Sequence, residues 1–312
     1  MLALGIDTSN YATSLAVYDS IGEVVCDKKR FLPVRPGQLG LRQSDALFHH
    51  TQALPDMLAE LGREVDLTRI GTVGVSAKPR PAEGSYMPCF LAGVSAAAAF
   101  AAARALPLHQ TTHQQGHAAA ALLAAGGPAL LEQKVLLFHI SGGTTDLLLC
   151  DQVRRIALLG TSSDLYAGQA VDRLGVRLGF AFPAGAEVSR LAAQCTEAVR
   201  PKCRVDGLSC SLSGLENQCA ALLQAGKSPA YVCRYCLECI GETVVRMTRA
   251  AAEQYPGLPV VCAGGVMSSD VIRAYVQAHL PQTAFVPGRF SSDNAIGVAV
   301  LAAREAENGG CD

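Results

Sequence analysis

The chain has 312 residues, of which 50% are hydrophobic and 17% are charged. A chain of this length can bury a full core, and we expect a soluble globular protein of two domains. Its 26 basic residues nearly balance its 27 acidic ones, which excludes a general electrostatic attraction to nucleic acid or to anionic lipid. Any contact with RNA would need a local basic patch or a partner protein.

The start of the chain and its cysteines indicate the cellular compartment in which the protein is expected. Met1 runs directly into the strand-like LALGI, without a basic segment and a hydrophobic signal core before it. We therefore expect the 12 cysteines to be reduced thiols of a cytoplasmic protein. The longest apolar stretch, Phe90 to Ala103, is interrupted by Gly93 and Ser95 and is shorter than the roughly 20 residues of a membrane span, so no membrane segment is expected.

One pattern occurs twice along the chain. Residues 2–20, LALGIDTSNYATSLAVYDS, predict a strand, a tight polar turn and a second strand, because two apolar runs flank small and hydroxyl residues. Residues 134–151, KVLLFHISGGTTDLLLCD, repeat this order. We interpret the repeat as an internal duplication of one structural unit.

Later segments extend the duplication. TVGVSAKPR from Thr72 and VVCAGGVMSS from Val260 each predict a buried strand and a small-residue loop, followed by a helix. Strands that alternate with helices indicate an α/β fold with a parallel sheet covered on both faces. The glycines and proline of AAGGPALLEQ, residues 124–133, favour a boundary between domains 1–130 and 131–312.

Two histidines have the spacing of metal ligands. His113 and His117 lie four residues apart in HQQGHAAAALL, so on a helix both imidazoles would project from one face. The alternative is two histidines at a polar helix end. Asp293 could supply a carboxylate, although an aspartate before an apolar helix is also typical of an N-cap. Such a set suits iron or zinc better than magnesium.

Two glycine pairs could surround a nucleotide. In the turn from His139 through Ile140, Ser141, Gly142 and Gly143, glycines would let backbone amides approach a phosphate, although a plain hairpin is the alternative. Gly264 and Gly265 lead from a strand into an expected helix and would leave room for a base or ribose.

The cysteines of CRYCLEC, Cys233, Cys236 and Cys239, have a spacing that suggests iron–sulfur ligation. The segment reads as one long helix, on which residues three and six apart do not enclose a cluster, so we favour buried core thiols.

The loop from Ala77 to Cys89 contains three prolines and is expected to be exposed. The short basic clusters 28–30 and 200–204 lack interleaved aromatic residues and favour a solvated surface.

Together the motifs resemble a known family. LGIDTS, HQQGH, HISGGTT, AGQAVDRLG with FPAGAEVSRLA, SLSGL, AGGV and SSDNA occur in the same order as in the tRNA threonylcarbamoyladenosine synthase family. The resemblance implies a two-lobed actin-like (ASKHA) fold with duplicated ribonuclease-H-like lobes. It also implies transfer of threonylcarbamoyl from its adenylate to the adenosine beside the tRNA anticodon.

The resemblance implies roles for single residues. His113, His117 and Asp293 match the family's ligands to one divalent metal, and residues 139–143 match its phosphate-side loop. Asp172 and Gly185 match positions that hold the nucleoside of ATP or of the adenylate, and Ser269 stands at a position that contacts the ligand and is also expected to line the site. The resemblance also implies that partner subunits supply much of the tRNA-binding affinity, within a hetero- or homodimer.

Several residues depart from the family pattern. Four residues stand where the family has acids: Tyr11 and Ala12 replace an acidic pair, Leu165 replaces an aspartate and Gln169 replaces a glutamate. Thr144 replaces a histidine, Glu216 replaces a lysine, and Ser269 replaces an asparagine that contacts the ligand. These changes favour an alternative, a non-catalytic paralog that acts as a binding or regulatory subunit. A sugar or acetate kinase of the same fold, with Asp7 as its acid, is a third hypothesis that gives the histidine pair no role.

Overall fold

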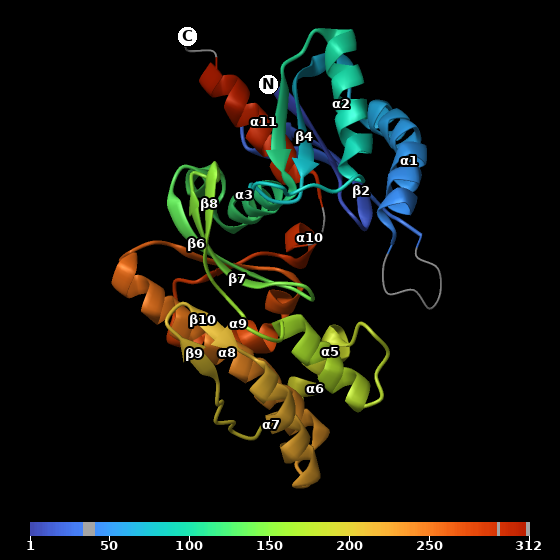
Figure 1. Ribbon diagram of the computed structural model, residues 1–312. Coiled ribbons are helices and arrows are strands. Elements are labelled where there is room, and N and C mark those ends of the chain that lie inside the picture. Colours follow the sequence, from blue (N-terminus) through green and yellow to red (C-terminus); the bar gives the residue numbers. More distant parts are fainter. Residues whose placement is uncertain (34–40, 292–293, 310–312) are drawn as a thin grey trace. The chain divides into compact units, whose positions relative to one another are not determined.

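Figure 1 presents a computed structural model that describes residues 1–33, 41–291 and 294–309. The chain forms two compact units. Unit 1 comprises Met1–Leu131 and Asp293–Asp312, and unit 2 comprises Glu132–Ser292. Within the described ranges, no helix combines the length and the apolar character needed to cross a membrane.

Unit 1 is built on a five-stranded sheet of order β3-β2-β1-β4-β5. Strands β1 to β3 are antiparallel neighbours, whereas β4 and β5 continue the sheet parallel to β1. The strands are β1 (Leu2–Thr8), β2 (Ala12–Asp19), β3 (Glu23–Phe31), β4 (Ile70–Lys78) and β5 (Leu108–Thr112). The helices are α1 (Gln43–Glu64), the 3-10 turn η1 (Leu67–Arg69), α2 (Phe90–Arg104), α3 (His113–Gly126), α4 (Pro128–Leu131) and α11 (Ile296–Asn308).

Helices cover the sheet of unit 1. Buried side chains of α1 and α2, such as Met57 and Ala97, join those of β1, β2 and β4 in one apolar cluster. Helix α11 lies against β1 and β4 at two glycines: a Cβ atom on Gly5 would come within 2.6 Å of the Ala299 nitrogen, and one on Gly74 within 2.6 Å of the Val298 carbonyl oxygen. Glycine is therefore required at both positions for this helix to pack so closely.

Unit 2 repeats the same sheet, with the order β12-β11-β6-β7-β8. Its strands are β6 (Lys134–Ile140), β7 (Thr145–Asp151), β8 (Arg155–Thr161), β11 (Val260–Ala263) and β12 (Ala284–Phe285), and β9 (Arg204–Asp206) and β10 (Ser209–Ser211) form a separate hairpin. Its helices are α5 (Ala167–Arg177), α6 (Gly185–Ala192), α7 (Ser213–Gln224), α8 (Pro229–Gln254), the 3-10 turn η2 (Gly265–Ser268), α9 (Asp270–His279) and α10 (Gly288–Ser291).

The predicted duplication is confirmed, because both sheets have the same strand order and the same directions. The expectation of a parallel sheet is wrong in part. Each sheet is mixed, since the strand–turn–strand segments at residues 2–20 and 134–151 are hairpins, and a tight turn can only join antiparallel strands.

The C-terminal helix also differs from the predicted domain division. The sequence reading placed all of residues 131–312 in one lobe, but α11 packs on the sheet of unit 1. The close backbone approach at Gly5 and Gly74 is the physical reason. Nothing in the linear order of the motifs shows this return of the chain.

The cysteines of CRYCLEC lie in the core of unit 2. Helix α8 is 26 residues long, and Cys233, Cys236 and Cys239 on it are at most 1% exposed and carry free thiols. Burial raises the pKa of the Cys233 and Cys239 thiols to about 12. The interpretation as buried core thiols is confirmed. Figure 1 labels α8 in this unit.

Candidate nucleotide pocket and histidine pair

Helix α3 of unit 1 begins at His113 because its neighbours form a capping box. The Thr112 hydroxyl accepts a hydrogen bond from the Gln115 backbone nitrogen, and the Gln115 side chain accepts one from the Thr112 nitrogen. These bonds satisfy amide groups that the first helical turn leaves without partners. His113 and His117 therefore lie one turn apart on a fixed helix end, as predicted.

The two imidazoles face each other. The Nε2 atoms of His113 and His117 are 3.0 Å apart, and their rings meet edge to face. The Nδ1 atom of His113 lies 2.9 Å from Oδ1 of Asp7, a carboxylate that is 1% exposed at the end of β1. A carboxylate at Nδ1 directs Nε2 of His113 toward His117.

The distance between the two Nε2 atoms matches both a hydrogen bond between the rings and two ligands of one metal ion. Two nitrogen ligands at about 2.0–2.1 Å from one ion, at angles between octahedral and tetrahedral, are about 2.8–3.4 Å apart. The separation of the two Nε2 atoms falls in this range. The described residues alone contain no group of three or more histidine, cysteine or acidic residues arranged to hold a metal. Asp293, the third predicted ligand, lies outside the described residues.

The start of helix α11 lies within the described residues. The N-cap of α11 is Ala295, and the Ile296 nitrogen donates to the side chain of Asn294 at 3.1 Å. Asn294 thus supplies the capping oxygen.

In unit 2, the turn between β6 and β7 holds its own shape. The Ser141 hydroxyl lies 2.8 Å from that of Thr144 and accepts from the Gly143 nitrogen. The first turn of α5 packs directly on this turn, since a Cβ atom at Gly168 would lie 2.5 Å from the Ser141 carbonyl oxygen. Gly142 and Gly143 have open space where a side chain would be, so a ligand can approach their backbone.

Asp172 of α5 fixes the start of helix α6. Its Oδ1 atom accepts a hydrogen bond of 2.8 Å from the Ala184 nitrogen, one residue before α6 begins at Gly185. A Cβ atom at Gly185 would meet nothing within 4 Å. The aspartate therefore positions this helix end and leaves an open backbone beside it.

The two glycines after β11 have different roles. Gly264 has a φ of +103°, and a Cβ atom there would lie 2.1 Å from the Ile140 carbonyl oxygen, so it is a packing glycine between β11 and β6. Gly265 begins η2 and faces open space. Beyond η2, the Ser269 hydroxyl lies 2.8 Å from that of Ser189 on α6. This bond joins the two segments.

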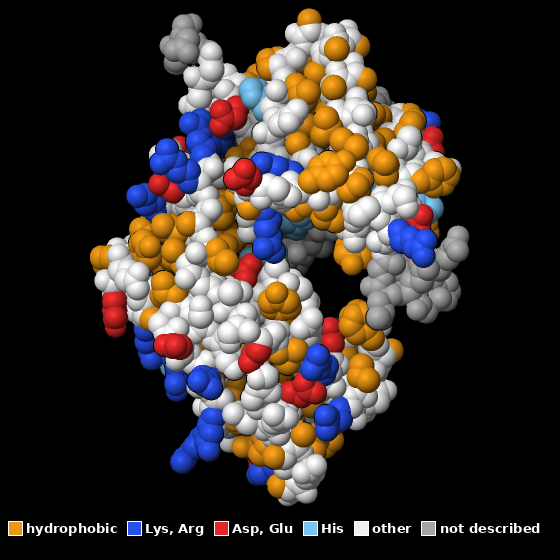
Figure 2. Space-filling view, viewed as in Figure 1, with side chains coloured by type: hydrophobic (Ala, Val, Ile, Leu, Met, Phe, Trp, Pro, Cys, Tyr) orange, Lys and Arg blue, Asp and Glu red, His pale blue; other side chains and the backbone are white. Residues whose placement is uncertain are grey.

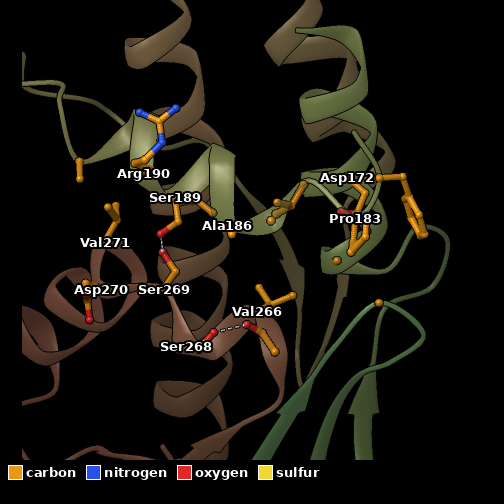
Figure 3. Close-up of a pocket in the computed structure, with 18 residues that line it drawn as sticks. Asp172, Pro183, Ala186, Ser189, Arg190, Val266, Ser268, Ser269, Asp270 and Val271 are labelled. Atoms are coloured by element: carbon orange, nitrogen blue, oxygen red, sulfur yellow. Dashed lines mark hydrogen bonds between the residues drawn. The ribbon is translucent and has the colours of Figure 1, made fainter. Parts of the chain in front are cut away.

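These elements enclose a pocket of about 810 Å³ within unit 2. Figure 3 shows Ser189 and Ser269 facing each other at one side, with Asp172 and Pro183 at the other. The lining is mostly apolar or glycine with a few polar groups, which is typical of a site for a small ligand. The pocket is lined by Gly142, Gly168, Val171, Asp172, Phe182, Pro183, Gly185, Ala186, Ser189, Arg190, Ala193, Leu237, Gly265, Val266, Ser268, Ser269, Asp270 and Val271.

Half of the predicted nucleotide residues line this pocket. They are Gly142, Asp172, Gly185, Gly265 and Ser269. The others support it or lie beside it: Ile140 is a core residue, Gly264 packs under the Ile140 carbonyl, and Ser141 and Gly143 shape the turn. His139 lies beside Thr144, with 3.5 Å between Nδ1 and Oγ1.

The sequence reading missed Ser189 and Arg190. Ser189 is one helical turn after Gly185, so helical spacing from that glycine could have indicated it. Arg190 pairs with Glu187 at 2.7 Å on the exposed side of α6, and no motif distinguishes it from a surface arginine.

Most departures from the family pattern in unit 2 lie off the pocket. Leu165 is 6% exposed in the core, and Gln169 accepts from the Tyr166 nitrogen at the start of α5. Glu216 pairs with Arg173 at 2.8 Å and with Arg177 at 3.9 Å. Only Ser269 among the departing residues of this unit lines the pocket.

Comparisons with known proteins agree with this architecture. The activator of 2-hydroxyisocaproyl-CoA dehydratase from Clostridium difficile, solved with bound ADPNP, has a TM-score of 0.57 and 12% identity, covering 99% of this chain and 97% of that one. A ROK family protein from Streptococcus pneumoniae TIGR4, in complex with sucrose, has a TM-score of 0.58 and 12% identity, covering 99% and 100%. The chain has the expected actin-like (ASKHA) fold.

Sequence similarity defines the family within this fold. A family model described as tRNA N6-adenosine threonylcarbamoyltransferase matches residues 37–300. A relative of that name from Streptococcus suis (strain 05ZYH33) is 29% identical over 323 residues, covering 97% of this chain and 92% of the relative. The chain belongs to the tRNA N6-adenosine threonylcarbamoyltransferase family.

Proposed function

We propose that the chain transfers a threonylcarbamoyl group from its adenylate to the adenosine beside the anticodon of tRNA. ATP or threonylcarbamoyl-adenylate would occupy the pocket of unit 2. The observation that carries the proposal is the convergence of Gly142, Asp172, Gly265 and Ser269 on this pocket from three separate segments, the β6–β7 turn, α5 and η2 with the residue after it. Family membership supplies the reaction type.

The transfer needs positioning more than strong acids or bases. The adenosine amine attacks the carbonyl carbon, a carbon–nitrogen bond forms, the bond from that carbon to the phosphate oxygen breaks, and AMP leaves as a good leaving group. The amine proton passes to solvent. Open backbone at Gly142 and Gly265 can approach the anion, and Asp172 holds the end of α6 in place.

His113, His117 and Asp293 would hold one divalent ion, iron or zinc. When bound, such an ion supplies Lewis-acid polarisation of a carbonyl or phosphate oxygen. The protein's own contribution is the orientation of His113 by Asp7 and the 3.0 Å separation of the two Nε2 atoms. The donor set is nitrogen with a carboxylate, which suits these metals.

We propose that partner subunits contribute to tRNA binding, in a hetero- or homodimer. On the face shown in Figure 2, lysine and arginine side chains are interspersed with acidic and hydrophobic ones and form no continuous basic surface. The near-zero net charge of the chain, −1, points the same way.

A non-catalytic role remains the second candidate. The Ser189–Ser269 bond favours it, because it ties up hydroxyls at the position where the family has a ligand-contacting asparagine. A protein of this kind would bind a nucleotide and regulate a partner without transfer.

A matched pair of glycine variants tests the proposal. Gly265→Leu would fill the pocket, whereas Gly214→Leu places the same side chain in open space on α7, away from the pocket. We expect Gly265→Leu to weaken ATP binding in calorimetry at least 10-fold and to abolish transfer of labelled threonylcarbamoyl from its adenylate to tRNA. The Gly214→Leu protein should behave as wild type.

The results separate the two candidates. Binding with transfer by the unsubstituted protein supports the enzyme. Binding without transfer, with partner subunits present, supports the regulatory role. ATP binding that survives Gly265→Leu would show that the nucleotide lies elsewhere and would remove the basis of both.

A further inference from the structure

A second pocket lies in unit 1, at the carboxyl ends of two parallel strands. Strand β4 ends at Lys78 and its parallel neighbour β5 ends at Thr112, with these two residues opposite each other. This edge of an α/β sheet is where ligands commonly bind. The pocket has a volume of about 460 Å³ and is lined by Ala77, Lys78, Pro81, Ser85, Tyr86, Gln110, Thr111, Thr112 and Gln115.

The pocket carries positive charge that none of the described acidic residues neutralises. Lys78 lines it and Arg80 follows two residues later. In the part of the chain that the structure describes, neither cation has a carboxylate within ion-pair distance. The nearest acid in sequence, Glu83, is an exposed loop residue. An unpaired lysine in a hollow with hydroxyl groups favours an anionic ligand.

An exposed aromatic ring lies in the same wall. The Tyr86 side chain is 63% exposed, so its ring is accessible to a ligand. The loop that carries it is held in shape, because the Arg80 nitrogen donates to the Ser85 hydroxyl and the Gln114 nitrogen donates to the Pro79 carbonyl oxygen. An exposed ring beside a cation can bind a nucleic-acid base by stacking and a phosphate by charge.

The pocket adjoins the histidine pair within the same unit. Thr112 and Gln115 line it, and they form the capping box that starts α3 at His113. At the other end of the loop, the Phe90 ring lies 6.0 Å from the His113 ring. A ligand in this pocket would therefore lie close to the proposed metal-binding side chains.

We propose that this pocket binds a nucleotide of single-stranded RNA, with a backbone phosphate beside Lys78 and a base stacked on Tyr86. The inference rests on the proposed function for the identity of that RNA, which would be the anticodon loop that carries the acceptor adenosine. The RNA contact itself depends only on Lys78, Tyr86 and the pocket. None of the family motifs named above contains Lys78, Arg80 or Tyr86.

The test measures binding of a synthetic anticodon stem-loop RNA to the full chain by fluorescence anisotropy at several salt concentrations. Lys78→Gln removes one charge and should weaken binding about 3- to 10-fold and lower the slope of log affinity against log salt by about 0.7–0.9. Tyr86→Ala should weaken binding about 5-fold or more, whereas Tyr86→Phe keeps the stacking ring and should bind as wild type.

Lys227→Gln is the matched control. Lys227 also lies beside an aromatic ring, 4.4 Å from the centre of Tyr231, but belongs to unit 2. Three outcomes would overturn the proposal. Lys78→Gln and Lys227→Gln could weaken RNA binding equally, Tyr86→Phe could weaken it as much as Tyr86→Ala, or the wild type could fail to bind the stem-loop. Weaker binding of free threonine by Lys78→Gln, with RNA affinity unchanged, would show a small-acid site and overturn it too.

The same variants are titrated with ATP, which separates this inference from the proposed function. ATP should bind all of them equally, because its pocket lies in unit 2. If the wild type shows no transfer or binds no ATP, while the Lys78 and Tyr86 substitutions still weaken RNA binding, the proposed function alone is contradicted. Normal transfer with no effect of either substitution on RNA would contradict this inference alone.

Discussion

The Nδ1 atom of His113 lies 2.9 Å from Oδ1 of Asp7. Asp7 belongs to β1 and His113 begins α3, so the contact spans 106 residues and fixes the imidazole from the sheet. Because the carboxylate takes Nδ1, only Nε2 is left to act with His117. The first strand of the chain thereby sets the direction of the candidate metal-binding nitrogen.

Replacing Asp7 with asparagine tests this role. An asparagine can still accept from Nδ1 but has no charge, so it holds the imidazole less firmly and makes Nε2 a weaker ligand. We expect Asp7→Asn to lower zinc or iron affinity about 10- to 100-fold, measured by competition with a chromophoric chelator. The fold should persist, as judged by circular dichroism.

Asp45→Asn provides the control, because Asp45 is an exposed acid in the first turn of α1. Equal metal affinity in the Asp7 and Asp45 variants would mean that Asp7 does not orient a ligand.

The two glycines after β11 illustrate what the sequence could and could not predict. The AGG motif indicated a turn from strand to helix, and the structure confirms a strand that ends at Ala263. The sequence could not separate Gly264, which is needed for packing, from Gly265, which opens the pocket. That difference depends on the position of the Ile140 carbonyl, which comes from a strand more than a hundred residues earlier.

The glycines make a matched pair for a stability measurement. Gly264→Ala places a Cβ atom 2.1 Å from the Ile140 oxygen at a φ that side chains rarely adopt, so we expect a loss of about 2 kcal/mol or more in the free energy of unfolding. Gly265→Ala meets open space and should change stability by less than about 0.5 kcal/mol. Urea denaturation followed by circular dichroism measures both. Similar losses in the two variants would contradict the assignment of separate roles.

More of the fold than of the site could be predicted from the sequence. Hairpins, the duplication and the helix that carries His113 and His117 follow from local patterns of apolar and turn residues. The return of α11 to unit 1 and the Ser189–Ser269 bond depend on which segments meet in space. The departures at Leu165 and Glu216 also needed the structure, since their burial and their ion pairs decide whether they reach the pocket.

Asp164 forms long-range hydrogen bonds with residues 211–213, and these bonds make the stability of the fold depend on pH. Its carboxylate accepts from the Ser211 hydroxyl at 2.7 Å, the Ser213 hydroxyl at 2.6 Å and the Leu212 nitrogen at 2.8 Å. It therefore caps α7 from 47 or more residues away. Burial opposes its ionisation, but the hydrogen bonds from Ser211 and Ser213 and from backbone amides outweigh burial and hold the pKa well below its usual range.

A lowered pKa in the folded state means that the unfolded chain binds a proton more readily. The stabilisation is therefore fully present above the ordinary aspartate pKa of about 3.9 and is lost as pH falls toward the lower folded value. We expect Asp164→Asn to lower the free energy of unfolding by about 1 kcal/mol at neutral pH, a modest figure because the carboxylate is exposed to water. Urea unfolding of both proteins from pH 7 to pH 3 should show this difference as constant down to about pH 5 and smaller below about pH 4. A difference that stays the same at pH 3 would show that the charge of Asp164 does not contribute, and that the substitution acts through shape alone.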